Sequence, residues 1–132
     1  MRLILTGLMF LFGLFNLFLG ASFLLNPVAM GEGFHLAPIG LGGMAVLRAD
    51  LTAFFLVAGG CQLWGGWRRN GDLLLVPIAL FAIAFSGRAI SAMVDGTIPG
   101  FWFEMSVEAL QVVLGIAAWR LLPHHKIDEI TG

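Results

Sequence analysis

Four long apolar segments constrain this chain more than any other feature of its sequence. They cover residues 3–25, 44–67, 73–94 and 101–122. Each has roughly 22 to 24 residues, which at 1.5 Å per residue is enough to cross a hydrocarbon core of about 30 Å. Backbone groups in lipid must be satisfied within the segment, and the alternation of barrel strands is absent. The sequence therefore predicts an all-α integral membrane protein, a four-transmembrane-helix bundle that forms a single domain over residues 1–132.

The composition excludes the common soluble classes. Of the 132 residues, 59% are hydrophobic and 11% are charged, whereas a soluble domain has about 25% charged residues. The net charge of −1 gives no electrostatic reason to expect a nucleic-acid partner. Cys61 is the only cysteine, so no internal disulfide can form. No motif for a metal, a nucleotide or a catalytic nucleophile is present, and we expect neither a metal site nor a cofactor.

The basic residues that flank one side of the spans predict the topology. They gather at the N-terminus, between the second and third spans, and at or after the end of the fourth span: Arg2, Arg68, Arg69, Arg120 and Lys126. The loops 26–43 and 95–100 contain no Lys or Arg. Because cytoplasmic loops carry the excess of Lys and Arg, both termini are expected in the cytoplasm and these two loops on the outer side. We read the first span as a retained helix, since it is long for the apolar core of a signal peptide.

Several ionisable residues lie inside the spans, toward the outer side. Arg48 lies in the second span, Arg88 in the third, and Glu104 and Glu108 in the fourth, with Asp50 slightly deeper than Arg48. A charge at the centre of a membrane helix costs roughly 2.5–3.5 kcal/mol on insertion scales, so it normally faces the bundle interior and a partner. A set of charges at matching depth predicts a polar chamber or an ion-pair cluster in the outer half of the bundle.

Helical spacing predicts which of these side chains share a face. Arg88, Ser91 and Asp95 lie on one face of the third helix at i, i+3 and i+7. Two further helices have a polar stripe of their own, suited to interhelical packing in lipid. These stripes are Glu104, Glu108 and Gln111 on the fourth helix and Arg48, Thr52, Phe55, Gly59 and Gln62 on the second. On the first helix, Asn16 lies between Gly13 and Gly20, and we expect it to form an interhelical hydrogen bond.

The charges inside the spans do not balance. Arg48 and Arg88 supply two positive charges against the three negative charges of Asp50, Glu104 and Glu108. Either one carboxylate is protonated, or a cation binds, or one acid reaches water. We expect the deeper acid, Glu108, to pair with Arg88, and Glu104 to lie nearer water. Such pairs can simply lock helices in register, but the polar groups here exceed what one ion pair needs.

The loop 26–43 is long and apolar for a helix connection. Its five glycines and two prolines argue against a regular helix. We expect it either to lie at the membrane interface or to cover the outer chamber as a lid. His35 in this loop is a single histidine and is weak evidence for a metal site.

Several short motifs resemble a family of small bacterial membrane proteins, "domain of unknown function 4345", within the wider DoxX-like group of four-helix membrane proteins. The matching residues, in chain order, are Asn26-Pro27, Leu47-Arg48-Ala49-Asp50, Gly87-Arg88-Ala89-Ile90-Ser91, Asp95-Gly96 with Pro99, and Glu108. The resemblance spans about residues 5–120. It implies a four-helix integral membrane fold and a multi-pass protein of the bacterial inner (cytoplasmic) membrane, but no particular activity.

Two classes of function follow from these residues. The first is a non-enzymatic protein that binds an amphiphilic or hydrophobic molecule (a lipid, a sterol-like molecule or a quinone), or an accessory subunit of a larger membrane complex. In the binding protein, the polar or anionic head of the bound molecule would meet Arg48 and Arg88. The second is a small membrane enzyme, an isomerase in which Glu104 or Glu108 transfers protons. Partners would be membrane lipids, the ligand, a larger complex or further copies of the chain.

Overall fold

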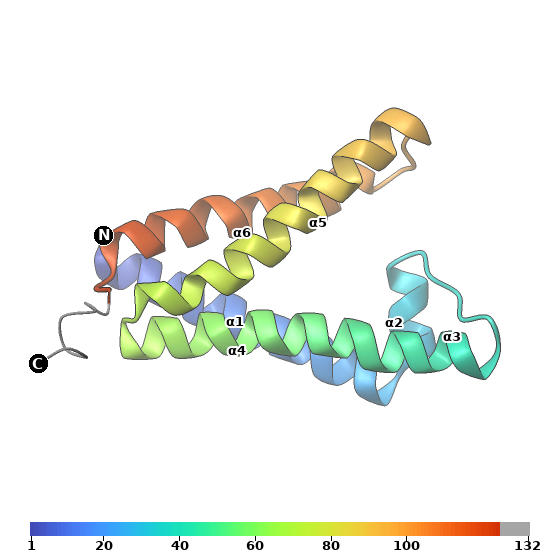
Figure 1. The fold of residues 1–132 in the computed structure, drawn as a ribbon, viewed down its shortest axis with the longest axis horizontal. Helices are drawn as coiled ribbons and strands as arrows, with labels where there is room; N and C mark the ends of the chain where they lie inside the picture. The colour runs from blue at the N-terminus through green and yellow to red at the C-terminus, as the bar shows by residue number, and fades with distance from the viewer. Residues whose placement is uncertain (125–132) are drawn as a thin grey trace, which may run out of the picture.

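A computed structural model describes residues 1–124, and within this range all regular structure is helical (Figure 1). The helices are α1 (Arg2–Leu25), α2 (Pro27–Gly33), α3 (Gly40–Val46), the π-helical turn η1 (Leu47–Leu51), α4 (Thr52–Arg68), the 3-10 turn η2 (Gly71–Leu74), α5 (Leu75–Val94) and α6 (Phe101–Leu121). Four continuous helical stretches are long and apolar enough to cross a membrane: Arg2–Leu25, Gly40–Arg68, Gly71–Val94 and Phe101–Leu121. The expected fold class is confirmed, and the chain is a multi-pass membrane protein.

The outer part of the second span differs from the prediction. The helix begins at Gly40 instead of residue 44, and it passes through the π-helical turn η1 before α4. The loop 26–43 also contains a regular helix, α2, which glycine and proline content argued against. Pro27 is the first residue of α2, where the missing backbone N–H would have no partner in any case. The short helix α2 thus extends the α1–α4 side of the molecule beyond the spans, and α3 forms the outer end of the second span.

A glycine seam joins α1 to α4. A Cβ atom on Gly13 would lie 2.6 Å from the backbone nitrogen of Leu63, and one on Gly59 would lie 2.7 Å from that of Leu17. The two backbones therefore approach as closely as small residues allow, which is how helices gain packing energy in lipid. Helices α5 and α6 form the second pair of the bundle.

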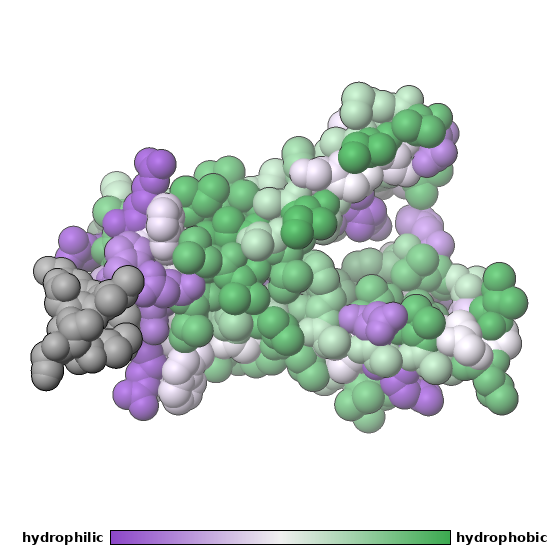
Figure 2. Space-filling model, in the orientation of Figure 1, coloured by the Kyte–Doolittle hydropathy of each residue, from purple (hydrophilic) through white to green (hydrophobic). Residues whose placement is uncertain are grey.

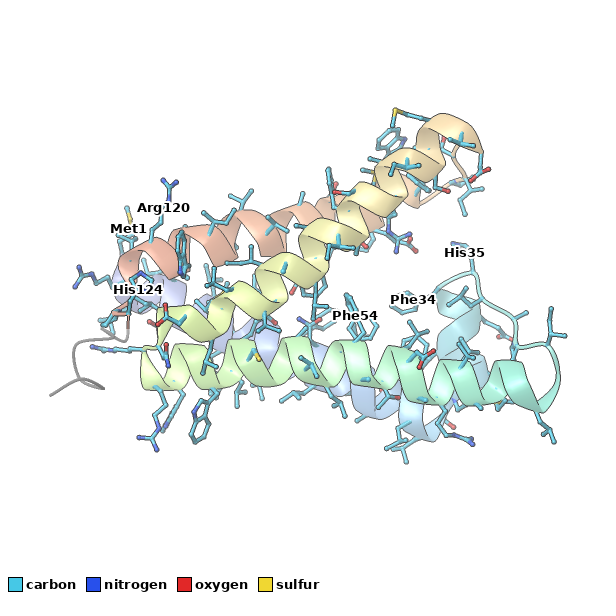
Figure 3. The ribbon with its side chains drawn as sticks, in the orientation of Figure 1. Met1, Phe34, His35, Phe54, Arg120 and His124 are labelled. Atoms are coloured by element: carbon cyan, nitrogen blue, oxygen red, sulfur yellow. The ribbon has the colours of Figure 1, made fainter. Side chains whose placement is uncertain are left out.

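The two helix pairs join at the end that holds the N-terminus. Buried side chains from both pairs form a core there: Leu5, Met9, Leu74, Ala118 and Leu122. Figure 3 shows Met1, Arg120 and His124 at this same end, which is the end predicted to be cytoplasmic. Lys126, which also entered the topology prediction, lies outside the described residues.

At the opposite end the two pairs diverge. Figure 1 shows the outer half of α5 rising away from α4 and from the α2–α3 segment. In the space-filling view of Figure 2 the molecule is hollowed between these two arms. Hydrophilic atoms reach this hollow from both arms, although the surrounding surface is apolar. We call this hollow the outer cleft.

A cluster of five phenylalanines lies where the two arms meet. Its neighbouring ring centroids are 5.1 to 5.8 Å apart, and its members are Phe23, Phe34, Phe54, Phe55 and Phe81. The contact between Phe54 and Phe81 links α4 to α5. In Figure 3, Phe34 and Phe54 point into the space between the two arms. The outer cleft therefore has an aromatic floor.

Candidate functional site

The charged wall of the outer cleft centres on Arg88 of α5. Its Nε donates to Oε1 of Glu108 on α6 at 2.8 Å. Its Nη1 forms a second ion pair with Oε2 of Glu104, one helical turn nearer the outer end of α6. The expected pair between Arg88 and Glu108 is therefore present. Glu104 also pairs with Arg88, and its side chain is more exposed than that of Glu108, as expected.

Exposure decreases along this ion-pair network from the cleft toward the interior. The side chains of Arg88, Glu104 and Glu108 are 29%, 23% and 11% exposed, respectively. The second oxygen of Glu108, Oε2, is buried and has no hydrogen-bond partner within residues 1–124. A buried carboxylate is normally satisfied at both oxygens, because burial without partners is costly. In this network the buried acid, Glu108, lacks part of its hydrogen bonding, while Arg88 and Glu104 remain partly accessible.

A second polar cluster lies deeper in the bundle and joins both helix pairs. The amide nitrogen of Asn16 on α1 donates to the side-chain oxygens of Gln62 on α4, at 2.6 Å, and of Gln111 on α6, at 2.8 Å. Nε2 of Gln62 also donates to Oε1 of Gln111 at 3.0 Å. All three side chains are buried. We call them the amide triad; it confirms the interhelical hydrogen bonding expected for Asn16.

The amide triad fixes which way the acids of α6 face. Glu104, Glu108 and Gln111 lie on one face of this helix, and Gln111 contacts α1 and α4 through the triad. The face that carries the two acids is consequently turned toward the α1–α4 pair, across the outer cleft. The triad lies one helical turn below Glu108 and closes the cleft from the interior of the bundle.

Arg48 and Asp50 do not join this site, which corrects the prediction of a single cluster. Both side chains are exposed, and Nε of Arg48 donates to the carbonyl oxygen of Leu24 at 3.2 Å. Among the described residues Asp50 forms no ion pair. The stripe predicted for Arg48 assumed regular α-helical spacing, and the wider turn of η1 interrupts that spacing at Leu47–Leu51. Thr52 and Gln62 remain buried, while Arg48 is turned outward.

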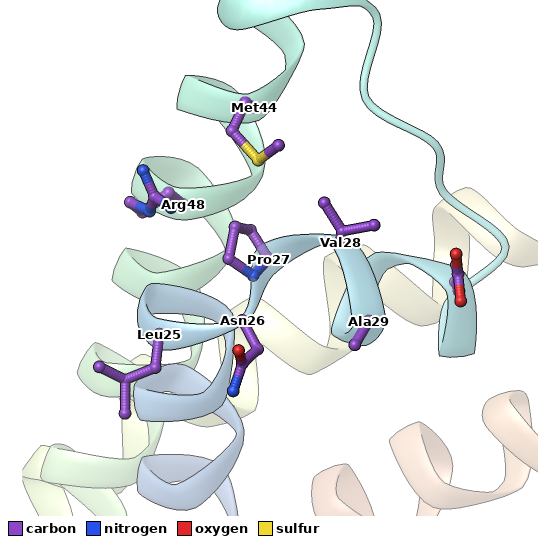
Figure 4. A pocket seen from close by; sticks show the side chains of 8 residues that line it. Leu25, Asn26, Pro27, Val28, Ala29, Met44 and Arg48 are labelled. Atoms are coloured by element: carbon purple, nitrogen blue, oxygen red, sulfur yellow. The ribbon is translucent and has the colours of Figure 1, made fainter.

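Arg48 instead lines a shallow pocket on the outside of the α1–α4 pair, with a volume of about 340 Å³ (Figure 4). Its other lining residues are Leu25, Asn26, Pro27, Val28, Ala29, Glu32 and Met44. In the close-up, Arg48 and Met44 lie on one helix, and Pro27 and Val28 lie on the other side of the pocket. This pocket is separate from the ion-pair network of Arg88. Arg48 therefore lies in the pocket and not in the network.

The remaining predicted residues lie at the rim. Oγ of Ser91 donates to Oδ2 of Asp95 at 3.0 Å, and both side chains are near the outer end of α5. They share a helix face with Arg88 but have no hydrogen bond to it or to the acids of α6. His35 is exposed and has a positive φ of 58°, and Figure 3 shows it just beyond α2, on the side of the α2–α3 segment that faces the outer end of α5. Within residues 1–124 no group of three His, Cys, Asp or Glu side chains could hold a metal ion.

Sequence reasoning missed two parts of the site. Gln62 was placed on a stripe of the second helix but was not chosen as a site residue, although a buried glutamine at mid-span is itself a signal for an interhelical hydrogen bond. The phenylalanine cluster gave no comparable signal, because phenylalanine at helical spacing is the ordinary filling of a membrane bundle. Only the divergence of the helix pairs makes these rings the floor of a cleft.

Comparisons of this chain with models of protein families, with curated proteins and with solved structures found no match.

Proposed function

We propose that this protein binds an amphiphilic molecule in the outer cleft and has no catalytic step of its own. The head group lies at Arg88, Glu104 and Glu108, and the hydrophobic part lies on the phenylalanine floor. The observation that carries the proposal is the combination of a charged wall and an aromatic floor in one hollow that opens toward an apolar surface. Ligand sites are typically concave and mostly apolar, with a few convergent polar groups.

The state of the ion-pair network supports binding over a purely structural role. A pair that only fixes the register of two helices is best buried and fully satisfied. Here the arginine and one acid are partly exposed to the cleft, while Oε2 of the other acid lacks a donor.

The location of the cleft completes the proposal. We place the protein in the bacterial inner membrane with the cleft facing outward, because the basic residues Arg68, Arg69 and Arg120 gather at the other end. We also propose membership of the family that the sequence resembles. Support comes from Arg88 and Glu108, two residues that carry the resemblance and contact each other across α5 and α6.

Native mass spectrometry of the gently extracted protein, with lipid analysis of what co-purifies, tests the binding proposal. One amphiphile per chain is expected in the wild type, and it should be lost in Glu104→Gln but retained in Arg48→Gln. Gel filtration checks that each variant is folded. An empty bundle, or one that carries only bulk phospholipid, contradicts the proposal; a stoichiometric partner protein in place of the amphiphile would instead indicate an accessory subunit.

One observation favours a second candidate, an isomerase-type membrane enzyme. Arg88 holds Oε1 of Glu108 in place and leaves Oε2 without a partner, which is an arrangement suited to moving a proton to and from a bound molecule. Glu108→Gln separates the two candidates once the amphiphile is identified. Catalysis predicts that turnover of the amphiphile stops while its binding persists; a wild-type protein that returns the amphiphile unchanged rules out the enzyme.

A further inference from the structure

We propose that the head group held in the outer cleft is a cation, of the ammonium class, rather than an anion. This inference rests on the proposed amphiphile binding and adds the chemical class of the ligand. It reverses the expectation that two arginines would meet an anionic head.

The first argument is the charge of the wall formed by α5 and α6. Between residues 81 and 111 the only basic residue is Arg88, whereas the acidic residues are Asp95, Glu104 and Glu108. Arg88 balances one of the two acids that it contacts, so one negative charge remains at the network itself. Coulomb interactions are strengthened where protein and lipid exclude water. The wall therefore attracts a cation and repels an anion.

The second argument is that neither arginine is available to an anion. Arg88 already uses Nε and Nη1 for Glu108 and Glu104. An anionic head group would have to displace a carboxylate that is attached to the same wall. Arg48 lies in the separate pocket and donates to the carbonyl oxygen of Leu24. The second positive charge expected from the sequence is thus missing from the cleft.

The third argument concerns hydrogen bonding. Within residues 1–124 the one atom of the ion-pair network that is buried without a partner is Oε2 of Glu108, and a carboxylate oxygen is an acceptor. This oxygen therefore lacks a donor. A primary ammonium head brings N–H donors, and an anionic head brings further acceptors.

The aromatic floor of the cleft also favours a cationic head group over an anionic one. Phe34, Phe54 and Phe81 belong to the aromatic cluster where the two arms meet. The face of an aromatic ring carries negative partial charge and attracts cations at distances up to about 6 Å, with roughly 0.5–2 kcal/mol per contact. A nitrogen cation bound between the wall and this floor would meet ring faces that favour it, and its alkyl chain would continue over their apolar surface.

The test uses three probes with the same chain length: dodecylamine, dodecyl phosphate and dodecanol. The full chain is placed in phosphatidylcholine nanodiscs at neutral pH, and binding is measured by calorimetry with empty nanodiscs as the blank. We expect saturable binding of one dodecylamine per chain, at least tenfold tighter than dodecyl phosphate and tighter than dodecanol. Equal or tighter binding of dodecyl phosphate or dodecanol overturns the cation assignment and leaves the amphiphile site in place; no saturable binding of any probe overturns the proposed function as well.

Two acid variants and a matched control locate the charge. Glu104→Gln and Glu108→Gln should each weaken dodecylamine binding at least tenfold. Each should also reduce the ratio of the dodecylamine affinity to the dodecyl phosphate affinity. Asp50→Asn removes the same charge from an exposed position away from the network and should change neither affinity. Equal effects of Asp50→Asn and Glu104→Gln would show a general surface attraction, which overturns the site. Since Glu104 is partly exposed, its variant remains informative if Glu108→Gln does not fold.

Discussion

Arg88 lies 2.8 Å from Glu108 through a single nitrogen–oxygen contact, and this contact leaves the other carboxylate oxygen of Glu108 buried without a donor. The same arginine also holds Glu104. The guanidinium of Arg88 thus links α5 to two acids on adjacent turns of α6, on the side of this helix pair that faces the outer cleft. The arrangement sets both the stability of this arm and the charge that a ligand would meet.

Removal of Arg88 should destabilise the fold. Arg88→Gln leaves two acids one helical turn apart without their cation, and the loss of one partner of a buried ion pair costs about 3–5 kcal/mol. Because Arg88 is partly exposed, we expect the lower end of that range, about 3 kcal/mol. Reversible unfolding in mixed micelles with increasing dodecyl sulfate measures the difference. Arg48→Gln, an exposed site, should change stability by less than about 0.5 kcal/mol; equal losses in the two variants would contradict the assigned pairing.

The glycine seam gives a prediction with a control at the next residue. Gly59→Ala places a methyl group 2.7 Å from the backbone nitrogen of Leu17, so α1 and α4 must separate. We expect a loss of about 1–3 kcal/mol, as for other overpacked sites. A Cβ atom on Gly60 has nothing within 4 Å, and Gly60→Ala should be neutral or slightly stabilising because alanine favours helix. The same unfolding assay ranks the two, and a more harmful Gly60→Ala would argue against this packing of α1 and α4.

The amide triad should contribute modestly to stability. Asn16→Leu removes the donor that serves both Gln62 and Gln111. Interhelical hydrogen bonds in membrane proteins contribute about 0.6 kcal/mol each, and at most about 1.7, so we expect a loss of about 1–2 kcal/mol. Ser22→Ala on the same helix is the control, because that hydroxyl bonds only to the carbonyl oxygen of Phe18. A loss for Asn16→Leu no larger than for Ser22→Ala would show that the triad does not hold the pairs together.

The sequence predicts the four spans well because membrane insertion depends on the length and apolarity of each segment, and both are local properties. It also predicts the contact between Arg88 and Glu108, since two charges at equal depth on adjacent helices have few other partners. The position of Arg48 was wrong because its predicted stripe assumed an uninterrupted α-helix, and η1 breaks that assumption. The outer cleft could not be predicted either. It depends on how far two helix pairs diverge, which is set by packing across the whole bundle.

The topology can be tested with single cysteines in a Cys61→Ala background. Glu32→Cys lies on α2 at the cleft end, and Pro123→Cys lies after α6 at the other end; both positions are exposed. In intact bacterial cells an impermeant maleimide should label Glu32→Cys, and it should label Pro123→Cys only after the membrane is permeabilised. The reverse pattern would turn the cleft to the cytoplasm and contradict the orientation inferred from the basic residues.

Crosslinking from the floor of the cleft tests the central claim most directly. A photoreactive phenylalanine analogue replaces Phe54, which points into the cleft (Figure 3), and in a control chain it replaces Ile83, which is 71% exposed on α5. Mass spectrometry then identifies what each position captures in the native membrane. The account predicts one dominant amphiphile at position 54 and the ordinary phospholipid mixture at position 83. The same phospholipid mixture at both positions would contradict a binding site in the cleft.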